Sequence, residues 1–599
     1  MNRAGLRRFL PGAITLLILA ADAFISVRNH ADLDRLLING ILALSAFATL
    51  HARMLSLANA GFMAIGAYAS AILSVKAGLP VTLSFPAALA ICGIVAVLIG
   101  LPVLRLTDVY LAICTLGFGE VVRILIVLLP GLTGGPTGAN LSTGFPYEAM
   151  RRVDTGMIAV FLAMLVYLFW TMAPSKTGRA FRAIRERPQA ASTMGIDIVA
   201  YRSLAFVMSA LIAGAAGAFY AHSVGSLDNG DFRFTRAVDI LGYAVLGGSG
   251  QWFGPLLGAG LLTALPILLR DSLGASIGFL RSFAQLPNIL TGLGLVLVIV
   301  FLPGGLAHVF RAQVTARRPH ALPPGRTGEG HAVPGPGVAR PAPGTSALLS
   351  VKGLGRVFGG VEALSGVSLE FDEGGVYGLI GPNGAGKTTF INLVSGLSAP
   401  DSGTITWRGR EIQGHRAHEI ARAGIARTFQ GVRLFDEMSV LENVVVGHHS
   451  RVHTNLASTW LRLPRETREE KAAMNEAAVL LARLGLSDLA GRPAGALSYG
   501  DQRRVEIARA LALDPRLLLL DEPAAGMNDA ETASLGSFLL ELKRRGYTLI
   551  VVEHHMDLIM GVCDRIDVLN FGRLIAQGTP AEIAGNEQVL EAYLGREEG

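Results

Sequence analysis

The sequence predicts two folds in one chain, a polytopic α-helical membrane domain followed by a soluble α/β domain. Composition is the first sign, because 51% hydrophobic and 16% charged residues over 599 positions are too apolar for an ordinary soluble protein. Apolar stretches of bilayer length occur before about residue 305 and not after about residue 345. Residues 317–344 are rich in Pro, Gly and Arg, which is typical of a flexible linker. We therefore expect a membrane domain at 1–310, a linker at 311–346 and the α/β domain at 347–599.

The first domain is expected to cross the bilayer about ten times. A segment at 237–249 is short and glycine-rich, which is typical of a broken or re-entrant helix inside a bundle. The other spans are expected near 11–27, 34–50, 57–75, 84–103, 108–130, 155–173, 203–223, 252–269 and 285–303.

Basic residues predict which ends of the spans face the cytoplasm. Arg3, Arg7 and Arg8 precede the first span, and Lys and Arg side chains cluster within 176–202. Both regions are expected to be cytoplasmic, and an even number of spans returns the linker to the same side. The alternative is a cleaved signal peptide, because the basic residues, the apolar run and Ala21-Asp22-Ala23 resemble one.

Charge and cysteine content argue against a nucleic-acid partner, a disulfide framework and a metal cluster. The net charge of +6 and the pI of 9.3 indicate membrane topology and not a nucleic-acid partner, because the basic residues lie mostly beside apolar runs. Cys92, Cys114 and Cys563 lie far apart, so we expect packed thiols and neither a disulfide framework nor a metal cluster.

A glycine-rich loop introduces the chemistry of the second domain. The stretch "GLIGPNGAGKTTF" at 378–390 contains the pattern G-x-x-x-x-G-K-[ST] between a predicted strand and a predicted helix. Glycines let backbone N–H groups turn toward a phosphate, Lys387 reaches the outer phosphates of a nucleotide, and Thr388 ligates Mg²⁺. A chance glycine turn is the alternative. The residues expected to bind ATP are Gly381, Asn383, Gly384, Gly386, Lys387, Thr388 and Thr389.

An acidic pair further along supports the nucleotide interpretation. The stretch "RLLLLDEP" at 516–523 predicts a buried parallel strand that ends in two carboxylates. We expect Asp521 to hold Mg²⁺ through water and Glu522 to polarise the water that attacks the phosphate. A solvated helix cap is the alternative for an isolated pair.

The stretch "LSYGDQRRVEIARAL" at 497–511 is the most specific motif in the chain. It matches the signature of the ABC transporters, and residues 349–597 resemble their ATP-binding subunits. The resemblance implies an α/β P-loop ABC ATPase domain that hydrolyses ATP. It also implies that Ser498 and Gly500 contact a nucleotide held by the phosphate loop of another subunit, as the N-terminus of a helix is suited to do.

Further positions carry over from the same family. Phe358 resembles the aromatic residue that stacks on adenine, Gln430 in "ARTFQ" resembles the glutamine that senses Mg²⁺, and His554 resembles the switch histidine near the γ-phosphate. The stretch "EPAAGMND" resembles the loop that pairs two ATPases. His555 stands where the family usually has Asp, and Asp501 where it usually has Gln. Neither is expected to touch a phosphate ligand, so we expect ATP turnover to survive both.

Both halves resemble the importers of branched-chain amino acids. In the second half the resemblance lies in "GVRLFDEMSVLENVVVGHH" and the terminal "VLEAYLG". In the first half it lies in "LSLANAGFMAIGAYASAIL", "LTGGPTGANL" and "YAVLGGSGQWFGPLLGA". The small residues of the first of these, Gly61, Gly66, Ala67, Ala69 and Ser70, are expected to let helices approach closely.

Charged and polar residues of the first half are candidates for a structural or functional role. Glu120 and Arg123 are three residues apart on one expected helix, and a structural pair is favoured over a substrate contact. The roles of Asp22 and Asn39 stay open. The segment 175–196 resembles the coupling loop of importers, where a short helix carrying Phe181 and Ile184 would fit a groove on the ATPase. Binding to anionic lipid is the alternative.

The sequence therefore predicts a permease fused to its ATPase, one half of an ATP-driven importer of branched-chain or other apolar amino acids in a bacterial inner membrane. The expected partners are a second permease, a second ATP-binding subunit and a periplasmic solute-binding protein, with a homodimer as the alternative. Urea, amides or small organic acids are alternative substrates. An ABC exporter and a membrane-anchored ATPase without transport are the alternative functions.

Overall fold

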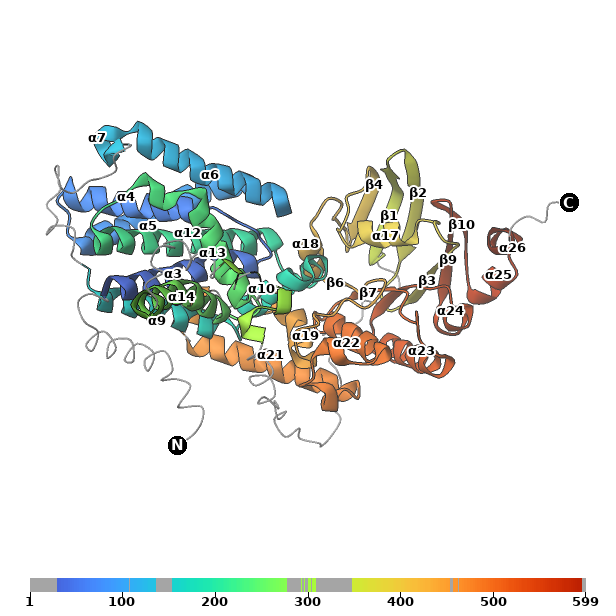
Figure 1. The fold of residues 1–599 in the computed structure, drawn as a ribbon. Helices are drawn as coiled ribbons and strands as arrows, with labels where there is room; N and C mark the ends of the chain where they lie inside the picture. The colour runs from blue at the N-terminus through green and yellow to red at the C-terminus, as the bar shows by residue number, and fades with distance from the viewer. Residues whose placement is uncertain are drawn as a thin grey trace. The chain divides into compact units, whose positions relative to one another are not determined.

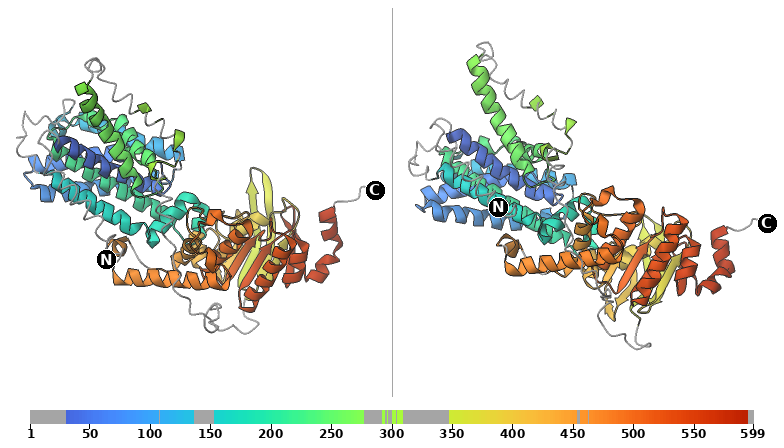
Figure 2. Two further views of the ribbon diagram at one scale, coloured as in Figure 1. Left: turned by 60° about the horizontal axis from the view of Figure 1, so that its bottom comes forward. Right: turned by 90° about the horizontal axis from the view of Figure 1, so that it is seen from below.

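The structure, a computed structural model, describes residues 30–106, 108–135, 153–276, 347–452, 456–461 and 463–594, with short pieces between 292 and 308. These residues form two compact units (Figures 1 and 2). One unit is helical. The other combines the α/β domain with residues Lys176–Ile198, which the sequence places between two spans. The predicted linker, the first span and most of the last span lie outside the described residues.

The helical unit consists mainly of apolar helices. Its elements are α3 His30–His51, α4 Asn59–Val75, α5 Val81–Val103, α6 Asp108–Leu128, α7 Pro130–Thr133, α9 Thr155–Met172, α12 Ile198–Val224, the 3₁₀ turn η4 Asn229–Phe232, α13 Phe234–Gly247 and α14 Gly254–Ser276. Among the described residues, five helices are long and apolar enough to cross a membrane, namely α3, α5, α6, α9 and α12. The predicted count of ten spans is therefore not confirmed.

Helix α13 confirms that the segment around 237–249 is too short for an ordinary span. Its 14 residues rise by about 21 Å, which is less than the roughly 30 Å of a hydrocarbon core. It packs mainly against α14 and α3.

Close helix crossings explain some of the small residues in this unit. A Cβ atom added at Gly66 would lie 2.1 Å from the carbonyl oxygen of Gly214, and one added at Gly217 would lie 1.9 Å from that of Met63. Helices α4 and α12 therefore meet backbone to backbone, as predicted for Gly66.

Polar side chains inside the helical unit bind one another. Glu120 and Arg123 form the predicted pair, with 2.7 Å between Oε2 and Nε. Asn39, whose role the sequence left open, donates to Thr263 Oγ1 at 2.9 Å and accepts from Arg236 Nη2 at 2.8 Å. Asn39 thus joins α3, α13 and α14 through satisfied hydrogen bonds.

The α/β unit contains two sheets (Figure 1). A four-stranded antiparallel sheet has the order β2-β1-β4-β5, and a six-stranded sheet has the order β10-β9-β3-β8-β7-β6, in which only β10 pairs antiparallel. The strands are β1 Leu349–Phe358, β2 Val361–Phe371, β3 Val376–Ile380, β4 Ser402–Trp407, β5 Arg410–Glu411, β6 Ile425–Arg427, β7 Leu517–Asp521, β8 Thr548–Val552, β9 Arg565–Asn570 and β10 Arg573–Gly578.

Helices cover these sheets and extend the unit. They are α10 Lys176–Glu186, α11 Pro188–Ser192, α17 Lys387–Val394, α18 Ala417–Arg422, α19 Val440–Gly447, α20 Leu456–Trp460, α21 Pro464–Arg483, α22 Tyr499–Leu511, α23 Asp529–Arg544, α24 Met556–Val562, α25 Pro580–Ala584 and α26 Glu587–Leu594, with 3₁₀ turns η6 His448–Ser450, η7 Ser487–Leu489 and η8 Ala494–Ala496. Every residue of β3, β7 and β8 is buried, which explains their continuous apolar sequences. Since parallel strands end at one edge of a sheet, the segments after β3 and β7 share that edge.

Candidate functional site

The glycine-rich loop lies between the end of β3 and the start of α17. Gly381, Gly384 and Gly386 have φ angles of +146°, +84° and +98°, a region that side chains with a Cβ rarely adopt. The loop leads directly into the first turn of α17, where free N–H groups and the helix dipole favour an anion. The predicted Asn383, Thr388 and Thr389 lie on this loop and this turn.

The Lys387 side chain is hydrogen-bonded to the glycine-rich loop. Its Nζ donates to the carbonyl oxygens of Gly381 at 2.6 Å and Pro382 at 3.0 Å. Burial lowers the pKa of Lys387, while the neighbouring Glu522 and Asp521 act in the opposite direction. The two hydrogen bonds hold the Lys387 ammonium at the loop, and its interaction with Glu522 and Asp521 indicates that the acidic end of β7 is also near.

Asp521 closes the buried strand β7. Its Oδ2 accepts a hydrogen bond from Arg427 at 3.0 Å, and its Oδ1 is buried with no hydrogen-bond partner among the described residues. Burial raises the pKa of Asp521, and Arg427 opposes this. An unpartnered carboxylate oxygen on the same sheet edge as the Thr388 hydroxyl suits Mg²⁺, which prefers oxygen ligands. The residues present therefore fit the predicted ion.

Glu522 has a strained backbone and a defined partner. Its φ is +49°, unusual for a residue other than glycine, and such strain is frequent at functional sites. Gln430 Nε2 donates to Glu522 Oε1 at 3.1 Å, so the structure brings these two predicted residues together. The His554 side chain is 58% exposed, and the backbone N–H of His554 donates to Glu553 Oε2 at 3.1 Å. An exposed imidazole on a fixed backbone is suited to contact a phosphate.

Buried arginines that the sequence analysis did not single out hold this site. Arg427 donates to Asn392 of α17 and to Ser395, the residue that follows this helix, in addition to Asp521. Arg503 is fully buried and donates to the carbonyl oxygens of Phe429 at 2.8 Å, Pro523 at 3.2 Å and Glu522. The signal was present in "IARTFQ" and "QRRVEIARAL", where arginines occur inside apolar segments.

The signature residues begin helix α22. Ser498 is its N-cap and accepts a hydrogen bond from Asp501 N–H at 3.3 Å. The Ser498 hydroxyl donates to Asp501 Oδ2 at 2.8 Å, and Arg504 pairs with the other oxygen at 2.5 Å. The expectation that Asp501 touches no phosphate ligand was therefore wrong, because it binds the hydroxyl of a predicted phosphate contact. Gly500 follows in the first turn of α22.

Phe358 is available for stacking. It ends β1, it is 46% exposed, and the Arg356 guanidinium lies 4.8 Å from its ring centroid. The alternative of an ordinary core aromatic is not supported by this exposure.

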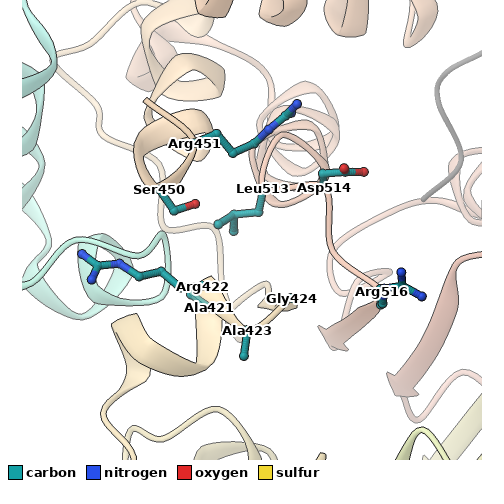
Figure 3. Close-up of a pocket in the computed structure, with 9 residues that line it drawn as sticks. All are labelled: Ala421, Arg422, Ala423, Gly424, Ser450, Arg451, Leu513, Asp514 and Arg516. Carbon is teal, nitrogen blue, oxygen red and sulfur yellow. The ribbon is translucent and has the colours of Figure 1, made fainter. Parts of the chain in front are cut away.

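A pocket of about 590 Å³ lies elsewhere in the α/β unit and includes none of the predicted residues (Figure 3). Three arginines line this pocket, and each of them binds a protein group. Arg422 donates to the Gly195 carbonyl, Arg451 pairs with Glu476, and Arg516 pairs with Glu373. We assign no ligand to this pocket.

Comparisons with known proteins identify the family. Residues 364–525 match the family described as "ABC transporter". A high-affinity branched-chain amino acid transport ATP-binding protein, LivG, of Salmonella typhimurium is 49% identical over 249 residues, which are 41% of this chain and 98% of the relative. The chain belongs to the branched-chain amino-acid ABC transporter family. BraF of Pseudomonas aeruginosa, a protein of the same description, is 46% identical over 249 residues, with the same coverage of both chains.

Two further matches extend the family assignment to the rest of the chain. Residues 33–302 match "Branched-chain amino acid transport system / permease component", and residues 573–599 match "Branched-chain amino acid ATP-binding cassette transporter". This ABC transporter therefore combines a multi-pass membrane permease with an ATPase that binds and hydrolyses ATP. The match 573–599 shows that the C-terminal segment is characteristic of the branched-chain ATPases.

Segment 176–198 of the transporter packs within the same compact unit as the ATPase. Helix α10 buries Phe181 and Ile184, which are 2% and 0% exposed, as the sequence predicted. Helix α10 packs against α19, and α11 packs against α18. This apolar face, named here the docking face, consists of Phe181 and Ile184.

Four arginines around the docking face bind four carboxylates of the ATPase. Arg182 pairs with Glu442 at 2.9 Å, Arg185 with Glu437 at 2.5 Å and Arg187 with Asp436 at 2.8 Å. Arg179 is 3% exposed and binds Glu470 with two nitrogens, the second at 2.9 Å. Since these arginines have carboxylate partners, the alternative of a segment bound to anionic lipid is disfavoured.

Proposed function

We propose that this chain imports branched-chain amino acids across a bacterial inner membrane at the expense of ATP. The observation that supports this best is the packing of 176–198, a loop between two permease helices, into the unit that holds the phosphate loop. A buried apolar contact surrounded by ion pairs allows conformational changes of the ATPase during hydrolysis to be transmitted to the permease. Urea, amides and small organic acids are less well supported, because the relatives are described as transporting branched-chain amino acids.

The proposed chemistry uses residues of two subunits. Lys387 and the loop N–H groups bind the outer phosphates, while Ser498 and Gly500 of another ATPase subunit close the site. Glu522 takes up the proton of the attacking water, and Gln430 holds that carboxylate in place. Thr388, Gln430 and Asp521 would hold Mg²⁺, which would neutralise part of the phosphate charge.

The orientation and partners follow from the same proposal. The N-terminus and the ATPase lie in the cytoplasm, because positively charged loops favour that side and the arginine-rich segment 176–187 belongs to the same compact unit as the ATPase. A second permease and a second ATP-binding subunit complete the transporter, and a periplasmic binding protein delivers the substrate.

Uptake in the native cells tests the proposal. Deletion of the gene is expected to abolish uptake of radiolabelled leucine, isoleucine or valine, and the wild-type gene is expected to restore it. Glu522→Gln should not restore uptake, whereas Glu541→Gln, which alters an exposed i,i+4 pair, should restore it fully. Net efflux would indicate an exporter, and unchanged fluxes of all three amino acids would remove this substrate class.

A further inference from the structure

The C-terminal helix of the chain contacts the phosphate loop through one hydrogen bond. The Gly381 N–H donates to the Tyr593 hydroxyl oxygen at 2.8 Å, across 212 residues of sequence. Tyr593 lies on α26, near the end of the described chain. We propose that Tyr593 is a positioning residue for ATP binding, whose hydroxyl fixes the start of the phosphate loop in its binding conformation.

The contacted N–H lies where strand pairing stops. Ile380, paired with Val568, is the last residue of β3, so Gly381 N–H lies just beyond the ladder. A Cβ atom added at Gly381 would lie 2.1 Å from the carbonyl oxygen of Leu569, so the loop begins in close contact with the last residues of β9. A buried N–H left without an acceptor is costly, and Tyr593 supplies the acceptor.

The same glycine is bound on its other side by the lysine that binds ATP. The Gly381 carbonyl accepts from Lys387 Nζ at 2.6 Å. When Lys387 turns to the outer phosphates of ATP, that carbonyl loses its donor. The Tyr593 bond does not involve Lys387, so it holds the loop start in both states.

Helix α26 is itself held by its surroundings. It packs against β10 and α25. Tyr593 is 38% exposed, and partial burial raises the pKa of its hydroxyl while the hydrogen bond from Gly381 acts in the opposite direction. It belongs to the segment 573–599 characteristic of the branched-chain ATPases, outside the match 364–525 shared with ABC transporters in general. The proposal therefore gives this family-specific segment a task in nucleotide binding.

Kinetics of the full chain, purified in its native complex, test the proposal. Tyr593→Phe removes only the hydroxyl and is expected to raise KM for ATP about three- to tenfold while kcat stays within about twofold, since a less ordered loop lowers affinity. Tyr377→Phe is the matched control. Its hydroxyl likewise accepts a backbone N–H bond, from Asp372 at 2.8 Å, but at the opposite end of β3.

Hydrogen exchange separates the local effect from general destabilisation. In the nucleotide-free complex, Tyr593→Phe is expected to accelerate exchange in the peptide containing Gly381, and Tyr377→Phe in the peptide containing Asp372. An unchanged KM in Tyr593→Phe, an equal rise in KM in both variants, or unchanged exchange at Gly381 would each overturn the proposal.

Discussion

At the scale of single residues, the proposed catalytic carboxylate of Glu522 and the proposed phosphate-binding lysine, Lys387, are expected to have separable roles. Glu522→Gln is expected to reduce ATP hydrolysis by about 10²- to 10⁴-fold while ATP binding persists, because the proton acceptor is lost and the loop is intact. Lys387→Ala is expected to reduce ATP affinity instead, because the outer phosphates lose their cation. Steady-state hydrolysis and binding of a fluorescent ATP analogue measure both. Near-normal turnover in Glu522→Gln would assign the catalytic base to another residue.

The acidic residue after the signature is the second test at this scale. Asp501 binds the Ser498 hydroxyl and places a negative charge beside a predicted phosphate contact. Asp501→Gln is expected to lower KM for ATP about two- to fivefold, because the hydroxyl is released and repulsion of the phosphate falls. Asp488→Asn, at an exposed position on η7, is the control and should leave KM unchanged. A higher KM in Asp501→Gln would mean that the carboxylate positions Ser498 usefully.

At the scale of elements, we propose that the ion pairs around the docking face couple the loop 176–198 to the ATPase. Arg179 is buried and binds Glu470 of α21 through two nitrogens. Arg179→Glu or Glu470→Arg alone is expected to reduce substrate uptake at least tenfold while basal ATP hydrolysis persists, because each leaves like charges in contact. The double reversal should restore part of the uptake. Arg465→Glu, an exposed position on the same helix, is the control. Failure of the double reversal to exceed either single variant would argue against a direct pair.

The end of α10 adds a dependence on pH. Burial raises the pKa of Glu186 to about 7. The hydrogen bond from the Glu437 N–H and the Arg185 cation act to lower this pKa, and the carboxylates of Glu437 and Asp436 act to raise it. A carboxyl group whose pKa rises on docking stabilises docking fully below its free pKa near 4.5, and this stabilisation is lost as the pH rises through 7. Coupled ATP hydrolysis is therefore expected to fall as the pH rises from about 4.5 to about 7 and to change little above that. Glu186→Gln should remove that fall, and an unchanged pH profile in this variant would contradict the assignment.

The elements also show what local sequence predicts and what it misses. The phosphate loop, the strand that ends at Asp521 and the helix carrying Phe181 each depend on a contiguous pattern, and all were predicted. Arg503 and Tyr593 were missed because their partners, Phe429 and Gly381, are distant in sequence. Such pairs arise only when the sheet brings separate segments together. The span count stayed open for a related reason, since the length of α13 depends on its packing and not only on hydropathy.

At the scale of the whole molecule, the fusion fixes only one of the couplings that an importer needs. Each ATP is proposed to lie between the Lys387 loop of one subunit and the Ser498 signature of another, so one copy of this chain forms no complete site. Four carboxylates of this ATPase already bind the arginines of its own loop. We therefore expect a second permease to require a second ATPase with its own docking surface.

The assembly is the last prediction. We expect a heteromeric complex of this chain with a separate permease and a separate ATPase. Because the chain is fused, its ATPase stays at high effective concentration beside its permease, and no tight ATPase dimer is required in solution. Native mass spectrometry of the complex, purified through a tag on this chain from its own cells, determines the composition. A complex of two copies without another permease or ATPase, active in uptake once the binding protein is added, would refute the heteromeric assembly and establish the homodimer. Loss of the second ATPase from the heteromeric complex should leave ATP bound but slowly hydrolysed, because Lys387 remains while the signature segment of the second ATPase is absent.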